Sequence, residues 1–328
     1  MKAIVTGGAG FIGSHMVDLL VKENIKVIVI DNLENGRLEN LEQHKGKIKF
    51  VKADISDYSF DFNKYFEDAH YVFHFAALAD IVPSINNPLK YHKANVDGTI
   101  NILQAAKSSK NLKKFVYAAS SSCYGIPKHY PTSEDTEIAP EYPYAHTKRV
   151  GEEYVMHWGQ IYNMPVVSMR FFNVYGPRHR TSGTYGAVFG VFLAQLLNKK
   201  PLTIVGDGEQ TRDFTFVTDV VDACLTAAKS DIKNEIMNVG SDNTYSVNYL
   251  VDLLGGEKVF IPKRPGEPDS TYADITKIKE LLGWSPKVSF EEGVKVMLEN
   301  IEQWKDSPIW DENSIEEATK DWFEYLGK

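Results

Sequence analysis

The sequence predicts an α/β fold in which a doubly wound parallel sheet is joined to a smaller, interleaved C-terminal α/β domain. Two observations lead to this prediction. In the first half of the chain, short apolar runs alternate with helical patterns, which is typical of parallel strands connected by helices. After Asn173 the composition changes to a segment rich in Gly, Pro and Arg, YGPRHRTSGTYG, which we interpret as a binding loop.

The elements follow from the order of these patterns. Helices are expected at about 11–22 and 89–107, and strands at 2–6, 26–31, 47–54, 71–77, 114–120 and 165–173. The second strand follows the first helix closely, as a right-handed crossover requires. A strand-like run at 235–240 is expected to return to the main sheet. The first domain is therefore predicted to hold 1–173 and this returning strand, and the second to hold 174–234 and 241–328.

Composition excludes several classes of protein. A length of 328 residues suggests one large domain or two closely joined ones. The net charge of −8 argues against nonspecific binding to nucleic acid or anionic membranes. No apolar run approaches the roughly 18 residues of a membrane span, and MKAIVTGG enters a strand without the spacing of a signal peptide.

The two cysteines and the C-terminal run have simple interpretations. Cys123 and Cys224 lie far apart and show no metal-ligand spacing, so we expect reduced thiols, no metal site and a cytoplasmic protein. For Cys123, beside a serine run, a small apolar role is favoured over a reactive one. The C-terminal run carries an apolar stripe of Trp322, Phe323 and Leu326, which we expect to dock on the body of the protein.

A glycine-rich loop, TGGAGFIG at residues 6–13, follows the first strand and opens the first helix. Gly7, Gly10 and Gly13 permit the tight turn, let the backbone approach a pyrophosphate and allow close helix–strand packing. The helix N-terminus presents free N–H groups to the phosphates. Asp31 ends the second strand, where a carboxylate accepts both ribose hydroxyls and repels a 2′-phosphate. The sequence thus predicts a Rossmann-type site for NAD rather than NADP, with a plain tight turn as the alternative.

Tyr144 and Lys148 stand four residues apart in PYAHTK, so on a helix both can point into one cleft. An unperturbed tyrosine titrates at about pH 10, too high for a base at neutral pH. A neighbouring cation favours the phenolate, so we expect Lys148, with an oxidised nicotinamide beside it, to lower the pKa of Tyr144. Such a pair alone occurs by chance in many helices. Together with the glycine loop and the serine run of AASSSCYG, it predicts an acid–base site.

Several motifs occur in one order and carry a family resemblance. The glycine loop is followed by the serine run, YAHTK at 144–148 and RFFN at 170–173, then by GDG at 206–208, RDF at 212–214 and RPGE at 264–267. The chain resembles the extended short-chain dehydrogenase/reductase family and, within it, the nucleotide-sugar 4-epimerases. The resemblance covers nearly the whole chain. It implies an isomerase with tightly held NAD that is reduced and reoxidised in each catalytic cycle.

The resemblance also implies roles for individual residues. Tyr144 would remove the proton of the sugar 4-hydroxyl while C4 gives hydride to NAD⁺, and Ser120 or Ser121 would orient that oxygen. Ser120 is the better match, four residues before Tyr124, although a polar strand end bonded to its own backbone would explain the serines alone. Lys148 would also hydrogen-bond the nicotinamide ribose. Other expected cofactor contacts are Phe11, Ile12, Asn32, Asp54, Ile55, Ala76, Ala77 and Asn95; for Asp54, an adenine contact and a solvated loop acid both stay open.

At the substrate end, the resemblance places Arg212 and Arg264 on the nucleotide diphosphate, a role that suits a planar guanidinium. Asn173 fits the first phosphate or sugar, and Glu267 fits the nucleotide ribose. Arg178 could join them or only solvate its loop. Apolar walls beside a base are expected from GTYGAVFG, which contains Val188, and the remaining substrate contacts are expected from Ser121 and Ser122.

Two positions bear on the reaction and the sugar. Related dehydratases and decarboxylases generally carry acidic residues in the serine run, where this chain has 120–122 as serines, so epimerisation without elimination is favoured. Thr271 matches a gate beside the sugar, where tyrosine favours plain hexoses and a small residue admits a 2-acetamido group. We therefore expect C4 epimerisation of UDP-N-acetylglucosamine and UDP-N-acetylgalactosamine, with UDP-glucose and UDP-galactose as a second pair. A one-residue shift of the alignment would place Tyr272 there instead.

Other readings of the chain stay open. Several galactose epimerases carry a lysine after the fourth strand, where this chain has Ala79 and Asp80. A UDP-glucuronate 4-epimerase is the main alternative, because Arg178 and Arg180 could meet a carboxylate. A nucleotide-sugar dehydrogenase or dehydratase is another, and a noncatalytic NAD-binding sensor is remote because the Tyr–Lys pair is present.

The resemblance further implies a homodimer, in which helices near 89–107 and 145–162 of two copies form a four-helix interface. Apolar positions that could serve either this interface or the core are Ile102, Leu103, Val150, Tyr154 and Trp158.

Overall fold

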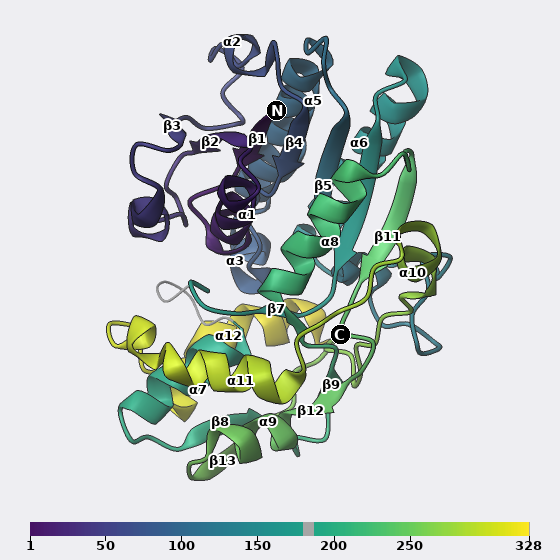
Figure 1. Ribbon diagram of the computed structural model, residues 1–328. Coiled ribbons are helices and arrows are strands. Elements are labelled where there is room, and N and C mark those ends of the chain that lie inside the picture. Colours follow the sequence, from purple (N-terminus) through teal and green to yellow (C-terminus); the bar gives the residue numbers. More distant parts are fainter. Residues whose placement is uncertain (180–186, 328) are drawn as a thin grey trace.

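A parallel sheet forms the centre of the larger part of the molecule (Figure 1). The computed structural model describes residues 1–179 and 187–327, and within them seven strands form this sheet in the order β11-β6-β5-β4-β1-β2-β3. Every neighbouring pair is parallel. The strands are β1 (Lys2–Thr6), β2 (Lys26–Asp31), β3 (Lys49–Lys52), β4 (Tyr71–His74), β5 (Lys114–Ser120), β6 (Val166–Phe171) and β11 (Glu235–Val239). The predicted fold class is confirmed.

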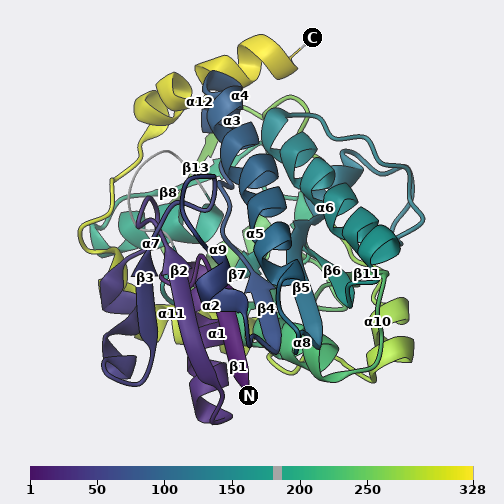
Figure 2. The same cartoon turned by 90° about the horizontal axis from the view of Figure 1, so that it is seen from above.

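Helices cover both faces of the sheet (Figure 2). Successive side chains alternate between the faces, so Val5 packs in the core beneath α1 and α8, whereas Ile4 packs in the core beneath α5 and α6. The first face is covered by α1 (Phe11–Lys22), α8 (Val217–Lys229) and α10 (Thr276–Leu282), and the second by α2 (Asn63–Phe66), α5 (Gly98–Lys107) and α6 (Pro143–Tyr162).

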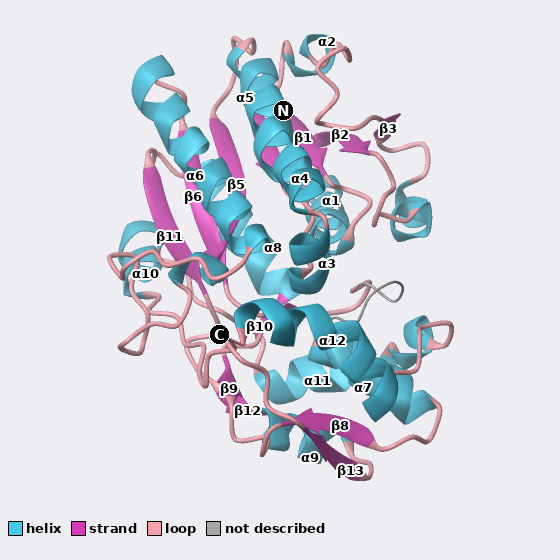
Figure 3. Ribbon diagram, turned by 180° about the vertical axis from the view of Figure 1, so that it is seen from behind, coloured by secondary structure: helices cyan, strands magenta, loops and turns pink. Residues whose placement is uncertain are grey.

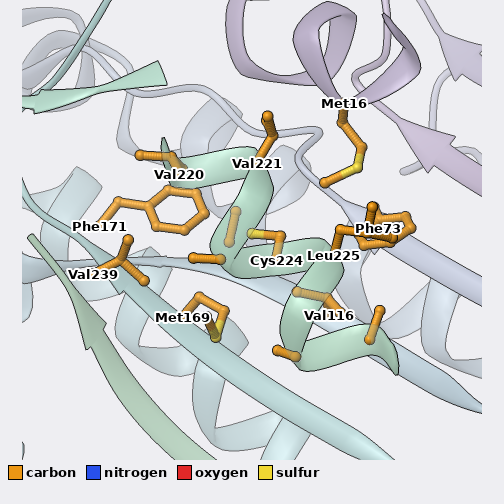
Figure 4. Close-up of a cluster of buried hydrophobic side chains, with 14 of the residues drawn as sticks. Met16, Phe73, Val116, Met169, Phe171, Val220, Val221, Cys224, Leu225 and Val239 are labelled. Carbon is orange, nitrogen blue, oxygen red and sulfur yellow. The ribbon is translucent and has the colours of Figure 1, made fainter. Parts of the chain in front are cut away.

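Figure 4 shows the core between α8 and the sheet, where Cys224 points among apolar side chains of both layers. Both cysteines are free and buried. Burial raises the pKa of the Cys224 thiol, and it raises the pKa of Cys123 to about 12. Both thiols therefore stay protonated at neutral pH, as in a packing role.

The expected helix at 89–107 is interrupted. It consists of α4 (Pro88–His92), a π-helical turn η2 (Lys93–Asp97) and α5. Ile102 and Leu103 are fully buried in the core of this chain, so they cannot contact a second copy. The other positions considered for an interface, Val150, Tyr154 and Trp158 on α6, are partly exposed.

The smaller part of the molecule has its own core, built around Tyr175, Phe189, Phe214 and Phe290. In the described chain it contains three two-stranded sheets, β7–β10, β8–β13 and β9–β12. Their bounds are β7 (Val174–Tyr175), β8 (Leu202–Val205), β9 (Thr211–Arg212), β10 (Thr215–Phe216), β12 (Tyr245–Ser246) and β13 (Lys258–Ile261). The helices of this part are α7 (Val188–Leu197), α9 (Val247–Leu254), α11 (Phe290–Glu299), η4 (Ile301–Trp304) and α12 (Glu312–Leu326). Short helices η1 (Leu38–His44), α3 (Ile81–Asn86) and η3 (Ser121–Tyr124) lie in loops of the main sheet.

The chain passes between the two parts more than once. β11 pairs with β6 at the sheet edge, and α8, which the predicted boundary assigns to the second domain, packs on the main sheet. The exact division into domains stays a prediction.

The C-terminal helix α12 lies at the junction of the two parts (Figure 3). It packs against α3 with Trp322 buried, and Leu326 lies over Gly266. Phe323 departs from the expected docking stripe, because 41% of it is exposed. Within 1–179 and 187–327 no helix is long and apolar enough to cross a membrane.

A buried ion pair joins α6 to β6. Arg170 donates from Nε and Nη2 to the two carboxylate oxygens of Glu152 at 3.0 and 2.7 Å, and both side chains are 2% exposed. Ser168 donates to the same carboxylate at 2.8 Å. Burial alone would raise the pKa of Glu152, but the hydrogen bonds and charge of Arg170 outweigh it and hold that pKa below its ordinary value.

Replacing Arg170 with Met will lower the free energy of unfolding by about 3–5 kcal/mol, because the buried Glu152 carboxylate loses its buried cationic partner. The carboxylate keeps Ser168 and the more exposed Arg149 as partners. Arg149→Met is the matched control. Arg149 lies 2.6 Å from the same Glu152 oxygen but its side chain is 23% exposed, so the expected loss is about 1 kcal/mol or less. Urea unfolding measures both variants. Equal losses would contradict the role given to burial.

Candidate active site

A cleft of about 790 Å³ lies at the carboxyl ends of the main-sheet strands and extends to the smaller part of the molecule. Its wall contains residues that directly follow β1 and β4, the strands between which the order of the sheet reverses. Ligands of doubly wound sheets bind at this position. Of the predicted site residues, all of which are described, only Lys148 and Asn95 are not part of the wall.

The glycine loop is built for close backbone approach. Gly7 has a φ of +68°, and a Cβ there would lie 2.7 Å from the backbone nitrogen of Ala76. A Cβ on Gly13 would lie 2.1 Å from the carbonyl oxygen of Gly7. The loop therefore requires glycine at both positions. Gly10 precedes α1 without a side-chain cap, so the first N–H groups of this helix are available to phosphates.

Two carboxylates lie at the cofactor end of the cleft. Asp31 accepts hydrogen bonds from the backbone of Ala9 at 3.0 Å and of Leu33 at 2.8 Å. Burial raises its pKa, although these bonds oppose the shift. Asp54 uses one oxygen to accept from the Ser56 amide and hydroxyl, at 2.9 and 2.7 Å. With Phe11, Ile12, Asn32, Ile55, Ala76 and Ala77 also in the wall, these groups fit a dinucleotide.

Tyr144 stands in the first turn of α6, with its phenol facing the serine run. The Ser120 hydroxyl is near enough to this phenol to favour its phenolate. Ser120 also lies 2.8 Å from the hydroxyl of Ser122 and accepts from the Ser122 amide at 3.2 Å. Ser121 lines the cleft as well. The pairing of Ser120 with Tyr144 stays a prediction.

The pKa of Tyr144 differs from expectation. Burial raises it above the ordinary value, the nearby Ser120 hydroxyl only partly opposes this, and the charge of Asp80 adds to the rise. The predicted lowering by Lys148 is therefore wrong for this structure. The reason is the position of Lys148, which is 5% exposed and has its Nζ 4.3 Å from the centroid of the Tyr117 ring.

Lys148 is held from its backbone side too, since the Tyr117 hydroxyl donates to its carbonyl oxygen at 3.2 Å. Burial lowers the pKa of Lys148 to about 7, against the opposing charge of Glu152. The cation–π contact stabilises its charged form.

Asn95, predicted as a cofactor contact, instead joins two elements behind the wall. Its amide nitrogen donates to the Leu78 carbonyl and to the Thr147 hydroxyl, both at 3.0 Å. Its oxygen accepts from the Leu78 amide at 2.8 Å. Asn95 therefore connects the loop after β4 to α6, and the π-helical turn of η2 is where it stands.

The predicted substrate residues meet at the other end of the cleft. Arg212 and Glu267 form an ion pair at 2.7 Å, and Arg264 lies 3.9 Å from the second Glu267 oxygen. Thr271 donates to Asn173 at 2.6 Å and accepts from the Asp213 amide at 3.1 Å. Thr271 lines the cleft, whereas the Tyr272 hydroxyl points to the carbonyl of Asp242, 3.5 Å away. Val188 lines it at the start of α7.

Of the two arginines considered for a carboxylate, the structure describes Arg178. Arg178 reaches the wall, but its guanidinium pairs with Asp18 of α1 at 2.8 Å. Arg180 lies outside the described residues. Ala79 and Asp80 line the cleft, as does Lys93 of η2, so a cation does stand near the loop after β4.

Comparison with known proteins is consistent with this geometry. The model of the family described as GDP-mannose 4,6 dehydratase matches residues 4–297. The chain belongs to this family. A putative UDP-glucose 4-epimerase of Methanocaldococcus jannaschii is 40% identical over 299 residues, which are 89% of this chain and 95% of the relative.

Two solved structures of similar proteins extend the comparison. A UDP-glucuronic acid 4-epimerase of Bacillus cereus, in complex with UDP-glucuronic acid and NAD, has a TM-score of 0.85 and 34% identity over 92% of this chain and 99% of its own. A UDP-N-acetylglucosamine 4-epimerase of Methanobrevibacter ruminantium, in complex with UDP-N-acetylmuramic acid, has a TM-score of 0.87 and 34% identity over 92% and 98%. The predicted membership of the extended short-chain dehydrogenase/reductase family is confirmed. The names of these three relatives contain three different sugars, which are glucose, glucuronic acid and N-acetylglucosamine.

Sequence reasoning missed several wall residues of this family member. The rings of Tyr142 and Tyr144 stack with their centroids 6.3 Å apart. The position of Tyr142, two residues before Tyr144 in the sequence, was a usable signal. Arg37 and Lys93 also line the cleft. Each lies several residues or more after the end of a strand and belongs to no local motif that would have indicated it. Trp322 enters the wall from the C-terminal helix, where the apolar stripe indicated docking but not the place.

Replacing Lys148 with Met will remove a pH dependence of stability. The pKa is about 7 in the folded chain and 10.5 for an ordinary lysine, so between these values the unfolded chain binds more protons. The cost of burying the charge is present below pH 7 and disappears as the pH rises toward 10.5. The free energy of unfolding of the parent protein should rise, relative to Lys148→Met, by about 1.4 kcal/mol per pH unit at most. Urea titrations between about pH 7.5 and 9.5 measure this, and parallel curves would refute the lowered pKa.

Proposed function

We propose that this protein is an NAD-dependent nucleotide-sugar 4-epimerase that accepts UDP-N-acetylhexosamines. The observation that carries the proposal is that Ser120 and Tyr144 line the same cleft as the glycine loop and two arginines. The relatives named 4-epimerases support this reaction, and the B. cereus structure with NAD supports the cofactor.

The residues divide the work along the cleft. Gly7, Gly10 and the α1 N-terminus would hold the pyrophosphate of NAD, and Asp31 would hold a ribose. When bound, NAD supplies reversible hydride transfer at C4 of the sugar. Arg212 and Arg264 would bind the diphosphate of the sugar nucleotide with their planar guanidinium groups.

Proton transfer belongs to Tyr144. Its phenolate takes the proton of the 4-hydroxyl as the 4-keto sugar forms, and Ser120 keeps the sugar oxygen within reach of the phenol. The ketone then turns over, and Tyr144 returns the proton to the same oxygen after reduction on the other face. Because burial raises the pKa of Tyr144, a positive charge beside the phenol is needed to form its phenolate at neutral pH. The ammonium of Lys148, one helical turn from Tyr144, would have to turn from the Tyr117 ring to the phenol to supply it.

The serine run supports epimerisation over dehydration or decarboxylation. Residues 120–122 are all serine, the first at the end of β5 and the other two at the start of η3, so the run carries no carboxylate. Asp80 and Glu141 line the cleft from other segments. A 4-keto-6-deoxy product would overturn this part of the proposal.

The position of Thr271 supports an acetamido sugar. Its small side chain lies in the wall, hydrogen-bonded to Asn173, while the tyrosine next to it points away. A uronate has less support, because Arg178 is paired with Asp18.

We also propose a homodimer formed through α6, with Val150, Tyr154 and Trp158 at the interface. A monomer in light scattering would contradict it.

Purified protein should convert UDP-N-acetylglucosamine to its galacto epimer without added cofactor, as followed by proton NMR. Tyr144→Phe should lower the rate by about 10²–10⁴-fold while the NAD content, measured after denaturation, stays the same. Should nothing happen, NAD and then UDP-glucose and UDP-glucuronate are added. Turnover of only one of these would correct the sugar, and inactivity on all three would contradict the reaction.

Thr271→Tyr should lower turnover of UDP-N-acetylglucosamine at least about tenfold more than turnover of UDP-glucose, because the larger side chain fills the space for the acetamido group. Thr271→Val is the matched control. It keeps the size but loses the hydrogen bonds to Asn173 and Asp213, so it should leave the ratio of the two rates unchanged. An equal loss on both sugars in Thr271→Tyr would reject the gate.

A further inference from the structure

The C-terminal helix α12 contacts both parts of the molecule beside the cleft. It begins at Glu312, beyond residue 297, the last that the family model matches. On one side it packs against α3, which follows β4 and lines the cleft with Ile81 and Val82 (Figure 2). On the other side the indole nitrogen of Trp322 donates to the carbonyl of Pro265 at 2.6 Å. The helix thus spans from the sheet to the loop that carries Arg264.

Trp322 contacts both the side chain of Arg264 and the backbone next to it. Its ring centroid lies 5.5 Å from the Arg264 guanidinium, within the range of a cation–π contact. Its hydrogen bond to Pro265 holds the backbone next to that arginine. Trp322 is 6% exposed, and what it exposes is part of the cleft wall.

Glu267 lies between Arg264 and the second arginine, Arg212. Arg264 lies 3.9 Å from one oxygen of Glu267, and Arg212 lies 2.7 Å from the other. The Arg264 side chain is 11% exposed, so it is largely desolvated between the indole and this carboxylate. A cation–π contact is strongest under such conditions.

We propose that Trp322 is a positioning residue that holds Arg264 for the diphosphate of the substrate; this rests on the proposed function. A free arginine has many rotamers, and fixing them on binding costs affinity. Trp322 fixes the guanidinium and the adjoining backbone before the ligand arrives. The role concerns binding of the diphosphate, so it affects affinity and KM rather than the proton transfer at Tyr144.

The test measures binding of UDP by titration calorimetry. Trp322→Leu should weaken UDP binding about tenfold, and Trp322→Phe, which keeps an aromatic face, should weaken it less. Phe323→Leu is the matched control on the same helix; Phe323 is 41% exposed, so this variant should bind as the parent does. With UDP-N-acetylglucosamine, Trp322→Phe should raise KM and leave kcat unchanged. Should Trp322→Leu not fold, Trp322→Phe still carries the comparison.

A double-mutant cycle separates positioning from general support of the fold. In an Arg264→Gln background, Trp322→Leu should have less than about a twofold further effect on UDP binding, because the group it positions is gone. The same loss in both backgrounds, or parent-like affinity of Trp322→Leu, would overturn the inference.

The outcomes also separate this inference from the proposed function. If the parent protein binds UDP but turns over no sugar nucleotide, the reaction is wrong and the calorimetry still decides the role of Trp322. If it binds none of UDP, GDP and dTDP, the diphosphate role of Arg264 fails, and this inference fails with it.

Discussion

The geometry of the site depends on the buried ion pair between Glu152 and Arg170. Residues 144, 148 and 152 share one face of α6, because each is four residues from the next. Glu152 can reach Arg170 only when that face is turned toward β6, and this rotation also turns Tyr144 toward the end of β5. A buried pair of this kind adds little net stability, but an unpaired charge in its place is costly, so alternative rotations of the helix are disfavoured. The arginine extends the constraint, since it donates to the Tyr124 hydroxyl at 2.8 Å, and that hydroxyl donates to Asn238 of β11 at 2.7 Å.

Two further hydrogen bonds hold the first half of α6. Asn95 bonds Thr147, and the Tyr117 hydroxyl bonds the Lys148 carbonyl. The helix is therefore attached to β5, β6 and the helix α4-η2-α5 by polar contacts that are all internal. Burial favours the neutral form of both titrating groups, since it raises the pKa of Tyr144 and lowers the pKa of Lys148. The Tyr117 ring offsets this for Lys148, whereas the phenolate of Tyr144 depends on what binds in the cleft.

The sequence was sufficient where a local pattern determines the structure. The bounds of β1, β2 and β5 follow from apolar runs that end in Thr6, Asp31 and Ser120, and the glycine loop was found because its function is in its backbone. It was insufficient where the partner comes from a distant segment. The spacing of Tyr144 and Lys148 places them on one helix face, but the Tyr117 ring that takes the ammonium is about thirty residues away in another element. For the same reason neither the bond of Asn95 to Leu78 nor the pairing of Arg178 with Asp18 was expected. A pattern predicts which face is buried, not against what.

The substrate end has its own organising group, the buried carboxyl of Asp213. It accepts from the backbone of Ser241 at 2.6 Å and of Ala273 at 3.0 Å, while its own amide donates to Thr271. Burial raises its pKa to about 6, against these hydrogen bonds. Asp213 directly follows Arg212, so one residue connects the segment after β11, the arginine proposed for the diphosphate and the proposed gate residue Thr271. Under the proposed function, recognition of the diphosphate and recognition of the sugar are therefore coupled through Asp213. A change at Thr271 that displaces the Asp213 amide will also move Arg212. The control Thr271→Val is needed because it removes the hydroxyl that binds this amide without filling the space beside the sugar.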